Sequence, residues 1–261
     1  MPDLLPGLAD ARALLQAARR VVVVTGAGIS AESGVPTFRG EGGVWGRFRA
    51  EELATPEAFR RDPCQVWAWY DHRRLALAGC APNPGHEAVA RFLLGRPDVH
   101  LVTQNVDGLH QRALAALGAS VPHPRVHELH GSIARLRCAR PGCDWLAEDA
   151  RRVEADRLET LPRCPVPGCE GLLRPDVVWF GEMLPEAALT GSFEAASRAD
   201  VALVVGTSAL VHPAASVPLA TLQGGGVLVE VNPEPTPLSR HARWGLRGPA
   251  GAILPALLDP A

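Results

Sequence analysis

The chain has 261 residues, a length that suits one large domain or one domain with an inserted module. Hydrophobic residues make up 47% of it and charged residues 21%, as in an ordinary globular protein with a sizeable core. The formal net charge of −2 argues against a broad electrostatic surface for nucleic acid or anionic membranes. We therefore expect neither as a partner.

Residues 1–20 carry two Asp and no continuous apolar core, so they do not have the pattern of a secretory signal. Their apolar positions follow the spacing of a surface helix: Leu8, Ala11, Leu14, Leu15 and Ala18. No stretch approaches the roughly 20 apolar residues of a membrane span. We expect a soluble, cytoplasmic protein.

Short apolar, β-branched runs recur along the chain, and each ends in glycine or polar residues. They are Val21–Val24, Val99–Thr103, Val201–Gly206 and Gly226–Val231. Helix-like stretches such as His86–Gly95 and Gly108–Leu117 lie between them. This alternation predicts an α/β fold with a Rossmann-like, doubly wound parallel sheet, whose ligands bind at the carboxyl ends of the strands.

Two segments interrupt the alternation. The first is rich in tryptophan and suggests a helical module at approximately residues 41–84. The second holds paired cysteines with Pro and Gly, and suggests a metal-binding module at approximately residues 133–174. We expect one domain, 1–261, in which these modules form a smaller lobe. The larger lobe then comprises approximately residues 1–40, 85–132 and 175–261.

Four of the six cysteines form two pairs with identical spacing, Cys138/Cys143 and Cys164/Cys169. In a chain expected to be intracellular, this pattern favours metal binding over disulfides. Cys64 and Cys80 stand apart and are expected to pack within helices.

Two polar segments follow predicted strands. In the first, from Gly26 to Gly34, glycines permit close approach of a pyrophosphate and a following helix offers free N–H groups, although a tight turn would also explain them. In the second, from Thr103 to His110, amides and a carboxylate suit a ribose and a carboxamide. The alternative is a helix start capped by Asp107 or Asn105.

A third segment, His127-Glu128-Leu129-His130-Gly131-Ser132, contains two histidines three residues apart. That spacing differs from the H-E-x-x-H of zinc proteases, which requires four. A general base and an ordinary loop or core histidine both remain open from the residues alone.

Taken together, the segments resemble the sirtuin family in order and spacing, from Val21 to Leu257. The matching motifs are GAGISAESGVPTFRG, TQNVDGLH, HELHGS, the two cysteine pairs, RPDVVWFGE, VVGTS and VNPEP. The resemblance implies a single catalytic domain with NAD as co-substrate and one structural Zn²⁺. It implies transfer of an acyl group from a lysine in an extended protein segment to ADP-ribose, which releases nicotinamide and leaves an O-acyl-ADP-ribose.

By this resemblance His130 is the catalytic base, and imidazole suits the role because its unperturbed pKa of about 6.5 lies near neutrality. His127 has no such match and is expected to be structural. The zinc ligands would be Cys138, Cys143, Cys164 and Cys169. Four thiolates leave no open coordination position, so the ion would be structural.

The resemblance also implies a set of NAD contacts. The first polar segment would surround the pyrophosphate and nicotinamide ribose, the second would border the nicotinamide, and the later motifs would meet the adenosine. The implied residues are Gly26, Ala27, Gly28, Ser30, Ala31, Glu32, Phe38, Arg39, Trp45, Gln104, Asn105, Val106, Asp107, Gly206, Thr207, Ser208, Asn232, Pro233, Glu234 and Ala250.

The RPDVVWFGE segment resembles the family's substrate-binding strand, with Val178, Trp179 and Phe180 as implied contacts. An extended peptide would add between this strand and the segment after Ser208 by β-augmentation. Such binding depends on the backbone, so selectivity for the sequence around the lysine should be loose.

Asp62-Pro63 predicts a helix start, with Asp as N-cap and Pro at the first position. On this helix Tyr70 and Arg73 share a face with Val66 and Leu77. A guanidinium on an apolar face is costly unless an anion meets it. An internal acid, or a side chain that extends to water, would also satisfy it.

The Y-x-x-R pair resembles the desuccinylase and demalonylase branch of the sirtuins, and Ala54 matches that branch's small residue in the acyl channel. Our interpretation is an NAD-dependent deacylase that prefers succinyl- or malonyl-lysine and deacetylates more weakly. The alternatives are a deacetylase, a protein ADP-ribosyltransferase, and a non-catalytic NAD or ADP-ribose sensor. A pure sensor would not need the candidate base His130.

Overall fold

The computed structural model describes residues 5–35 and 50–259. Its larger part contains a six-stranded parallel sheet in the order β3-β2-β1-β7-β8-β9. The strands are β1 (Val21–Thr25), β2 (Val99–Thr103), β3 (Val126–Glu128), β7 (Val201–Val205), β8 (Val227–Val231) and β9 (Trp244–Leu246). The strand order reverses direction between β1 and β7, which confirms the predicted doubly wound sheet.

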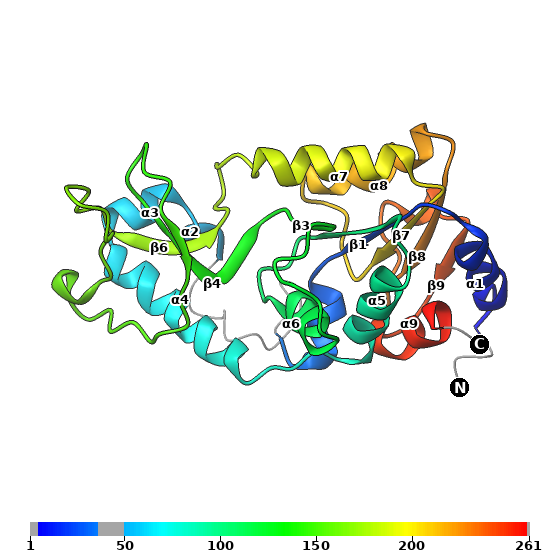
Figure 1. Cartoon of the computed structure of the whole chain (residues 1–261), viewed down its shortest axis with the longest axis horizontal. Helices are drawn as coiled ribbons and strands as arrows, with labels where there is room; N and C mark the ends of the chain where they lie inside the picture. The colour runs from blue at the N-terminus through cyan, green and yellow to red at the C-terminus, as the bar shows by residue number, and fades with distance from the viewer. Residues whose placement is uncertain (1–4, 36–49, 260–261) are drawn as a thin grey trace.

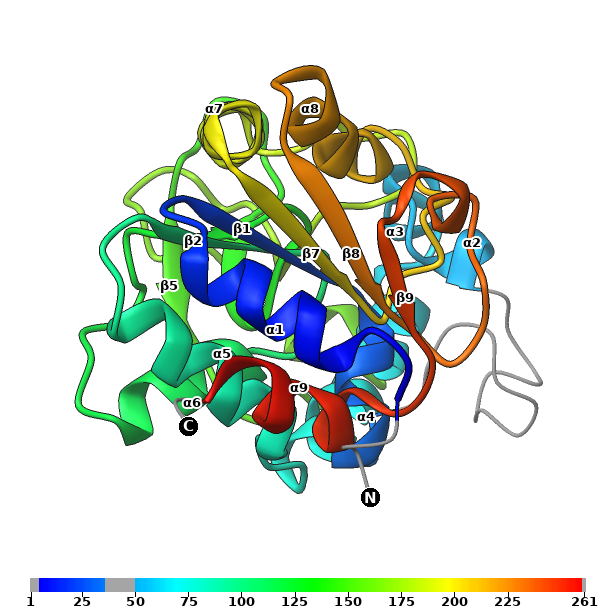
Figure 2. The ribbon, with the colours of Figure 1, turned by 90° about the vertical axis from the view of Figure 1, so that its right-hand side faces the viewer.

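Helices cover both faces of this sheet (Figures 1 and 2). On one face lie α7 (Glu186–Arg198) and α8 (Val217–Gln223). On the other lie α1 (Leu8–Ala17), α5 (Pro84–Leu94), α6 (Leu109–Ala116) and α9 (Ala250–Leu258). Short 3₁₀ helices are η2 (Ala27–Ser33), η4 (Leu158–Thr160), η5 (Ala214–Ser216) and η6 (Ser239–His241).

The two faces form separate apolar cores, and β1 contributes to both in alternation. Val21 and Val23 pack in the core beneath α1, α5 and α9, whereas Val22 and Val24 pack in the core beneath α7 and α8. Successive side chains of a strand point to opposite faces, so an unbroken valine run is what a strand covered on both sides requires. All five residues of β1 are accordingly buried.

The smaller part lies beside the larger one in Figure 1. It contains α2 (Ala50–Leu53), α3 (Pro56–Arg61), α4 (Pro63–Ala78) and an antiparallel sheet in the order β5-β4-β6. The strands are β4 (Gly131–Cys138), β5 (Leu146–Glu148) and β6 (Leu173–Val177). A third apolar core joins α4 to β4 and β6, and the Trp67 Nε1–H donates to the Leu173 carbonyl at 2.8 Å.

Helix α4 begins where the sequence predicts. The Asp62 carboxylate accepts from the Gln65 N–H at 2.9 Å, and Pro63 occupies the first helical position. Val66, Tyr70 and Leu77 on its predicted face are buried, and Arg73 is partly buried. In residues 5–35 and 50–259, no helix has both the length and the hydropathy needed to cross a membrane.

Candidate active site

The candidate site begins at the carboxyl edge of the large sheet, where hydrogen bonding continues one residue beyond the central strands. The Gly26 N–H donates to the Val205 carbonyl, and the Gln104 N–H donates to the Thr25 carbonyl, both at 3.0 Å. Gly206 donates to Val231 at the same distance. The first residues after β1, β2 and β7 are thereby held side by side, at the edge where doubly wound sheets bind ligands.

The glycine segment after β1 packs directly against the loop after β7. The Gly28 N–H donates to the Gly206 carbonyl at 2.8 Å, and a Cβ on Gly28 would lie only 2.6 Å from the Gly206 Cα. Gly206 itself has φ of 59°, which favours glycine. The following helix, η2, is a 3₁₀ helix. These glycines therefore serve the contact between loops as well as any ligand.

Polar side chains from the later strands meet along this edge. The Gln104 amide Nε2 donates to the Thr207 hydroxyl at 3.1 Å. The Asn232 Nδ2 donates to the Thr207 and Glu234 carbonyls at 3.3 and 3.1 Å. Amide, hydroxyl and backbone groups at strand ends form a donor and acceptor set that suits the hydroxyls and phosphates of a dinucleotide.

Asn105 and Asp107 join the loop after β2 to η2. The Asn105 Nδ2 donates to the Gly26 carbonyl at 3.1 Å and to the Ser30 hydroxyl at 3.2 Å. The Asp107 Oδ2 accepts from the Ser30 hydroxyl at 2.7 Å, while its Oδ1 accepts from the Leu109 N–H at 2.9 Å. Asp107 thus both supports the start of α6, as in the helix-start alternative, and faces the glycine segment. Burial raises the pKa of this carboxyl.

Beneath these groups lies a buried polar cluster that the sequence analysis missed. The Thr25 hydroxyl contacts the Thr103 hydroxyl at 2.9 Å and the His110 Nε2 at 3.0 Å. The Ser30 hydroxyl contacts the His86 Nε2 at 3.2 Å. Burial lowers the pKa of His86 to about 4 and that of His110 well below its usual value, so both rings are neutral. A neutral cluster can support the site without adding a cation.

Asn83 fixes η2 from below. Its Nδ2 donates to the Ile29 carbonyl at 2.7 Å and to the Ser33 hydroxyl at 3.1 Å. Its Oδ1 caps α5, and the His86 side chain completes a capping box. The Asn-Pro dipeptide before the predicted helix indicates a helix start in the sequence. The hydrogen bonds from Asn83 to the glycine segment cannot be predicted from it.

The candidate base, His130, is held in one tautomer. Its Nδ1 lies 2.8 Å from the Gln104 carbonyl, which can only accept, so Nδ1 carries the hydrogen. The neutral ring therefore keeps a lone pair on Nε2, which is free to accept a proton. Burial lowers the pKa of His130, and the hydrogen bond to Gln104 opposes that shift. The ring is thus neutral at pH 7, as a general base requires.

His127 has different surroundings. Its ring stacks on that of His100, with 10° between the ring planes, and the His127 Nε2 lies 3.1 Å from the His100 Nδ1. This hydrogen bond of His127 goes to another side chain, whereas that of His130 goes to a backbone carbonyl. This placement agrees with the structural role expected for His127.

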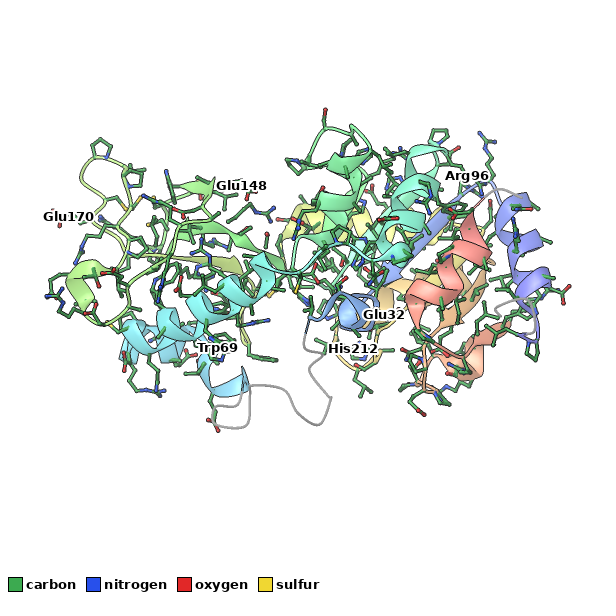
Figure 3. The ribbon with its side chains drawn as sticks, turned by 90° about the horizontal axis from the view of Figure 1, so that it is seen from below. Glu32, Trp69, Arg96, Glu148, Glu170 and His212 are labelled. Atoms are coloured by element: carbon green, nitrogen blue, oxygen red, sulfur yellow. The ribbon has the colours of Figure 1, made fainter. Side chains whose placement is uncertain are left out.

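Other predicted NAD contacts lie near the start of α9. The Glu32 Oε2 accepts from the Gly251 N–H at 2.5 Å, next to Ala250 in the first turn of that helix. A carboxylate there also interacts favourably with the helix dipole. In Figure 3, Glu32 lies at the inner end of the larger part, and Trp69 lies across from it in the smaller part. Phe38, Arg39 and Trp45 lie outside the residues that the structure describes.

The four paired cysteines converge in the smaller part. All four sulfur atoms lie within 4.8 Å of one another, with Cys138–Cys169 at 3.5 Å and Cys143–Cys164 at 3.7 Å. Tetrahedral zinc with Zn–S distances of about 2.3 Å places its sulfurs about 3.8 Å apart, whereas a disulfide requires about 2 Å. A Cβ on Gly171 would lie 2.7 Å from the Cys138 sulfur, so only glycine leaves room for the cluster. The predicted ligand set therefore fits one structural zinc ion.

The predicted acyl-binding residues gather between α4 and the end of β6. The Trp179 Nε1–H donates to the Tyr70 hydroxyl at 2.8 Å, and the Phe180 N–H donates to the Ala54 carbonyl at 2.9 Å. The Arg73 guanidinium lies 5.8 Å from the centre of the Tyr70 ring. Burial lowers the pKa of Arg73, and the charges of Tyr70 and Asp107 oppose that shift. The aromatic rings and the guanidinium thus lie together in one cluster.

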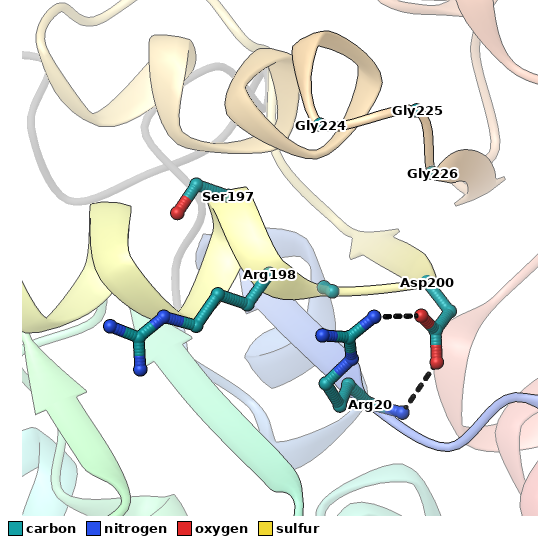
Figure 4. A pocket seen from close by; sticks show the side chains of 8 residues that line it. Arg20, Ser197, Arg198, Asp200, Gly224, Gly225 and Gly226 are labelled. Atoms are coloured by element: carbon teal, nitrogen blue, oxygen red, sulfur yellow. Dashed lines mark hydrogen bonds and ion pairs between the residues drawn. The ribbon is translucent and has the colours of Figure 1, made fainter.

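A separate hollow of about 320 Å³ lies at the opposite edge of the large sheet (Figure 4). There the Arg20 guanidinium binds the Asp200 carboxylate at 2.7 Å. The neighbouring N–H groups of Gly224, Gly225 and Gly226 all donate to carbonyls of the chain itself. These glycines therefore offer no free backbone donor to an anion, and the hollow lies at the wrong end of the strands for the ligands of this fold.

Comparison with known proteins agrees with this geometry. A family model described as the Sir2 family matches residues 26–213. The NAD-dependent protein deacylase 1 of Pseudomonas aeruginosa is 49% identical over 95% of this chain and 96% of its own length. The NAD-dependent protein deacylase of Pyrococcus furiosus is 46% identical over 97% of each chain.

Solved structures give the same result. A complex of a Sir2 homologue with NAD superposes with a TM-score of 0.84 at 43% identity, over 96% of this chain and 92% of that one. A Sir2 complex with a p53 peptide and NAD gives 0.77 at 32% identity, over 95% of each chain. The chain belongs to the Sir2 family, the sirtuins. The predicted family, fold and enzyme class are confirmed.

Proposed function

We propose that this sirtuin is an NAD-dependent protein-lysine deacylase that prefers succinyl- or malonyl-lysine and removes acetyl groups more weakly. The names of the similar bacterial and archaeal deacylases support NAD-dependent deacylation. The acyl preference rests on one observation, the Arg73 guanidinium 5.8 Å from the centre of the Tyr70 ring.

Bound NAD would supply the ribose carbon that the acyl oxygen attacks as the bond to nicotinamide breaks, and the ribose hydroxyl that then takes the acyl group as the lysine amine leaves. Asn105 and Asp107 would border the nicotinamide carboxamide, and their hydrogen bonds to Ser30 hold them against the glycine segment. The His130 Nε2 accepts the proton of the ribose hydroxyl, while Gln104 holds the opposite ring nitrogen. Thr207 and Asn232 would contact the adenosine end of NAD.

The acyl-lysine enters on an extended protein segment, and a Sir2 structure that contains a p53 peptide supports binding of a peptide to this fold. The N–H groups of Val178, Trp179 and Phe180 already donate to His130, Glu182 and Ala54 respectively. A peptide beside this segment can therefore donate hydrogen bonds to the segment's carbonyl groups. It finds few backbone N–H groups there from which to accept. This is β-augmentation on one side of the segment, with little dependence on peptide side chains.

The acyl group extends toward α4, where Arg73 is partly buried and Tyr70 is fully buried beneath it. A succinyl or malonyl carboxylate accepts two parallel hydrogen bonds from the planar guanidinium, and Tyr70 adds one from its hydroxyl. Acetyl-lysine offers neither contact. Because hydrogen bonds to charged groups contribute about 1.5–3 kcal/mol each, the preference for an acidic acyl group reaches tens- to thousandsfold in kcat/KM.

The test compares one peptide carrying acetyl-, malonyl- or succinyl-lysine, with and without NAD. Arg73→Met should lower desuccinylation at least tenfold more than deacetylation, and Tyr70→Phe should act in the same direction more weakly. The matched control is Arg74→Met, one residue along α4. The Arg74 guanidinium binds Asp149 in the same part of the protein, so its loss should lower stability and both activities in parallel.

Two outcomes would contradict the acyl preference. One is a wild-type enzyme that turns over acetyl-lysine fastest. The other is an Arg73→Met variant that behaves like Arg74→Met, which would show that Arg73 serves the fold alone. Neither outcome would affect membership of the family.

A further inference from the structure

We infer that Trp179 is a positioning residue of the acyl pocket: its indole N–H fixes the Tyr70 hydroxyl so that the hydroxyl hydrogen points to the acyl carboxylate. The inference rests on the proposed function, because it concerns the same pocket. It assigns the side chain of Trp179 a role distinct from the peptide contact proposed for its backbone in the segment after β6.

The geometry between the two rings restricts the hydroxyl. The Trp179 Nε1 lies 2.8 Å from the Tyr70 oxygen, and the two rings stack with 29° between their planes. Indole nitrogen is a donor only, so the Tyr70 oxygen accepts in this bond and its own hydrogen must point elsewhere. Tyr70 is 0% exposed, and in the described part of the chain no acceptor for that hydrogen lies within hydrogen-bonding distance.

A buried hydroxyl hydrogen without an acceptor is unfavourable, so the pocket favours a ligand that supplies one. Burial raises the pKa of Tyr70 to about 12, which keeps the hydroxyl protonated and able to donate throughout the neutral range. The neighbouring Arg73 guanidinium is a second donor and offers no acceptor. A carboxylate placed between the two residues can accept hydrogen bonds from both of them.

Trp179 is itself held in place by an ion pair. The Arg174 guanidinium lies 3.7 Å from the centre of the Trp179 ring and donates to both Glu182 carboxylate oxygens at 2.9 Å. The Glu182 Oε2 also accepts from the Trp179 N–H at 2.8 Å. The indole also contacts the ring of Phe59, with 5.3 Å between centroids. The indole therefore has little freedom to turn its N–H away from Tyr70.

A donor fixed before the ligand arrives needs no reorganisation when the ligand binds. Without the indole N–H, the Tyr70 hydroxyl is free to rotate and loses its orientation toward the acyl group. The loss should affect acidic acyl groups selectively, because acetyl-lysine has no carboxylate to accept the hydrogen bond.

The experiment is a double-mutant cycle read as the ratio of desuccinylation to deacetylation in kcat/KM. Trp179→Phe keeps an aromatic ring and removes the N–H. It should lower this ratio about two- to tenfold, the range expected for one hydrogen bond. In a Tyr70→Phe background no hydroxyl remains to orient. The double variant should therefore have the same ratio as Tyr70→Phe alone.

Trp67→Phe is the matched control. Trp67 is a fully buried tryptophan of the same core, and its Nε1–H donates to the Leu173 carbonyl and not to Tyr70. Its substitution should leave the ratio at the wild-type value in both backgrounds. Where Trp179→Phe does not yield folded protein, Glu182→Gln loosens the same indole and should lower the ratio in the same direction.

The possible failures are distinguishable. An enzyme that prefers succinyl-lysine, and whose ratio is unchanged by Trp179→Phe or falls equally in the Tyr70→Phe background, overturns this inference and leaves the proposed function standing. An enzyme that prefers acetyl-lysine in the wild-type form, with a ratio unchanged by Arg73→Met, overturns the proposed function and the inference with it.

Discussion

The candidate NAD site and the candidate acyl pocket are built differently. The first lies at the ends of parallel strands, where backbone groups and short polar side chains such as Gln104 and Thr207 are held by the sheet itself. The second lies between α4 and the end of β6, where aromatic side chains such as Tyr70 and Trp179 contact one another in an apolar core. Its geometry depends on packing between side chains.

This difference separates what the family shares from what a member can vary. A site made by strand ends changes little when side chains around it change, because its geometry belongs to the sheet. A pocket made by side chains changes its ligand with one or two substitutions. We expect substitutions in the first region to affect every acyl substrate alike, and substitutions in the second to change the order of preference among them.

The largest effect should come from the cysteine cluster, which supports only the smaller part. Chelation, or Cys164→Ser, should cause loss of folded protein, because structural zinc contributes directly to folding. Metal analysis should find one zinc ion for each chain. Cys64→Ser, outside the cluster, should keep the metal and the fold. Active, folded protein without zinc would contradict the assignment.

The next effect concerns His130, which belongs to the first region. Its replacement by Ala should lower turnover of every acyl substrate about a hundred- to ten-thousandfold while NAD binding persists. His127→Ala should retain turnover, because His127 faces His100 and not Gln104. Stopped assays with acetyl and succinyl peptides would detect a loss confined to one acyl group, which would argue against His130 as the shared base.

The pH profile gives a second measurement on the same residue. Only neutral imidazole accepts a proton, and burial lowers the pKa of His130. Activity should therefore persist as the pH falls through the ordinary imidazole value of about 6.5, and the acidic limb should lie below it. If the acidic limb of the profile lies above about pH 6.5 for both acyl substrates, a different ionisable residue limits the reaction.

The sequence predicts the large sheet well because its central strands are covered on both faces. The run Val99–Thr103 forms β2 with the predicted ends, and the other three runs differ from β1, β7 and β8 by about a residue. Strands β3 and β9 have three residues each, too few for a hydrophobic period to appear. Of the antiparallel sheet around the cysteines, only β6 overlaps a predicted strand, the RPDVVWFGE segment, and Pro and Gly interrupt the pattern of the rest.

The candidate site divides in the same way. Residues in motifs after strands could be named from the sequence, because parallel strand ends meet at one edge. The contacts beneath them could not, since Thr25, His86 and His110 lie in different elements and contact only in the folded chain. The bond between Trp179 and Tyr70 joins residues 109 positions apart, and no local pattern encodes it.

A smaller effect is expected within the first region itself. Asn105→Ala or Asp107→Ala should weaken inhibition by free nicotinamide about tenfold, because each removes a polar contact beside Ser30. Asn232→Ala, the same change at the adenosine end, should raise the KM for NAD and leave nicotinamide inhibition intact. Unchanged inhibition in both variants would favour the helix-start explanation of this segment.

The smallest effect tests whether stability and selectivity separate in the second region. The Asp62 carboxylate caps α4, the helix that carries Tyr70 and Arg73, and makes no contact with either. Asp62→Ala should therefore lower the free energy of unfolding by about 1 kcal/mol, the usual contribution of an N-cap. Thr55→Ala removes the cap of α3, where the hydroxyl accepts from the Ala58 N–H at 3.0 Å, and should cost a similar amount.

Denaturant unfolding measures both losses, and the acetyl and succinyl peptides measure the ratio of activities. If either variant changes that ratio as much as Arg73→Met does, destabilisation of this part alone accounts for the selectivity, and the comparison between the two regions fails.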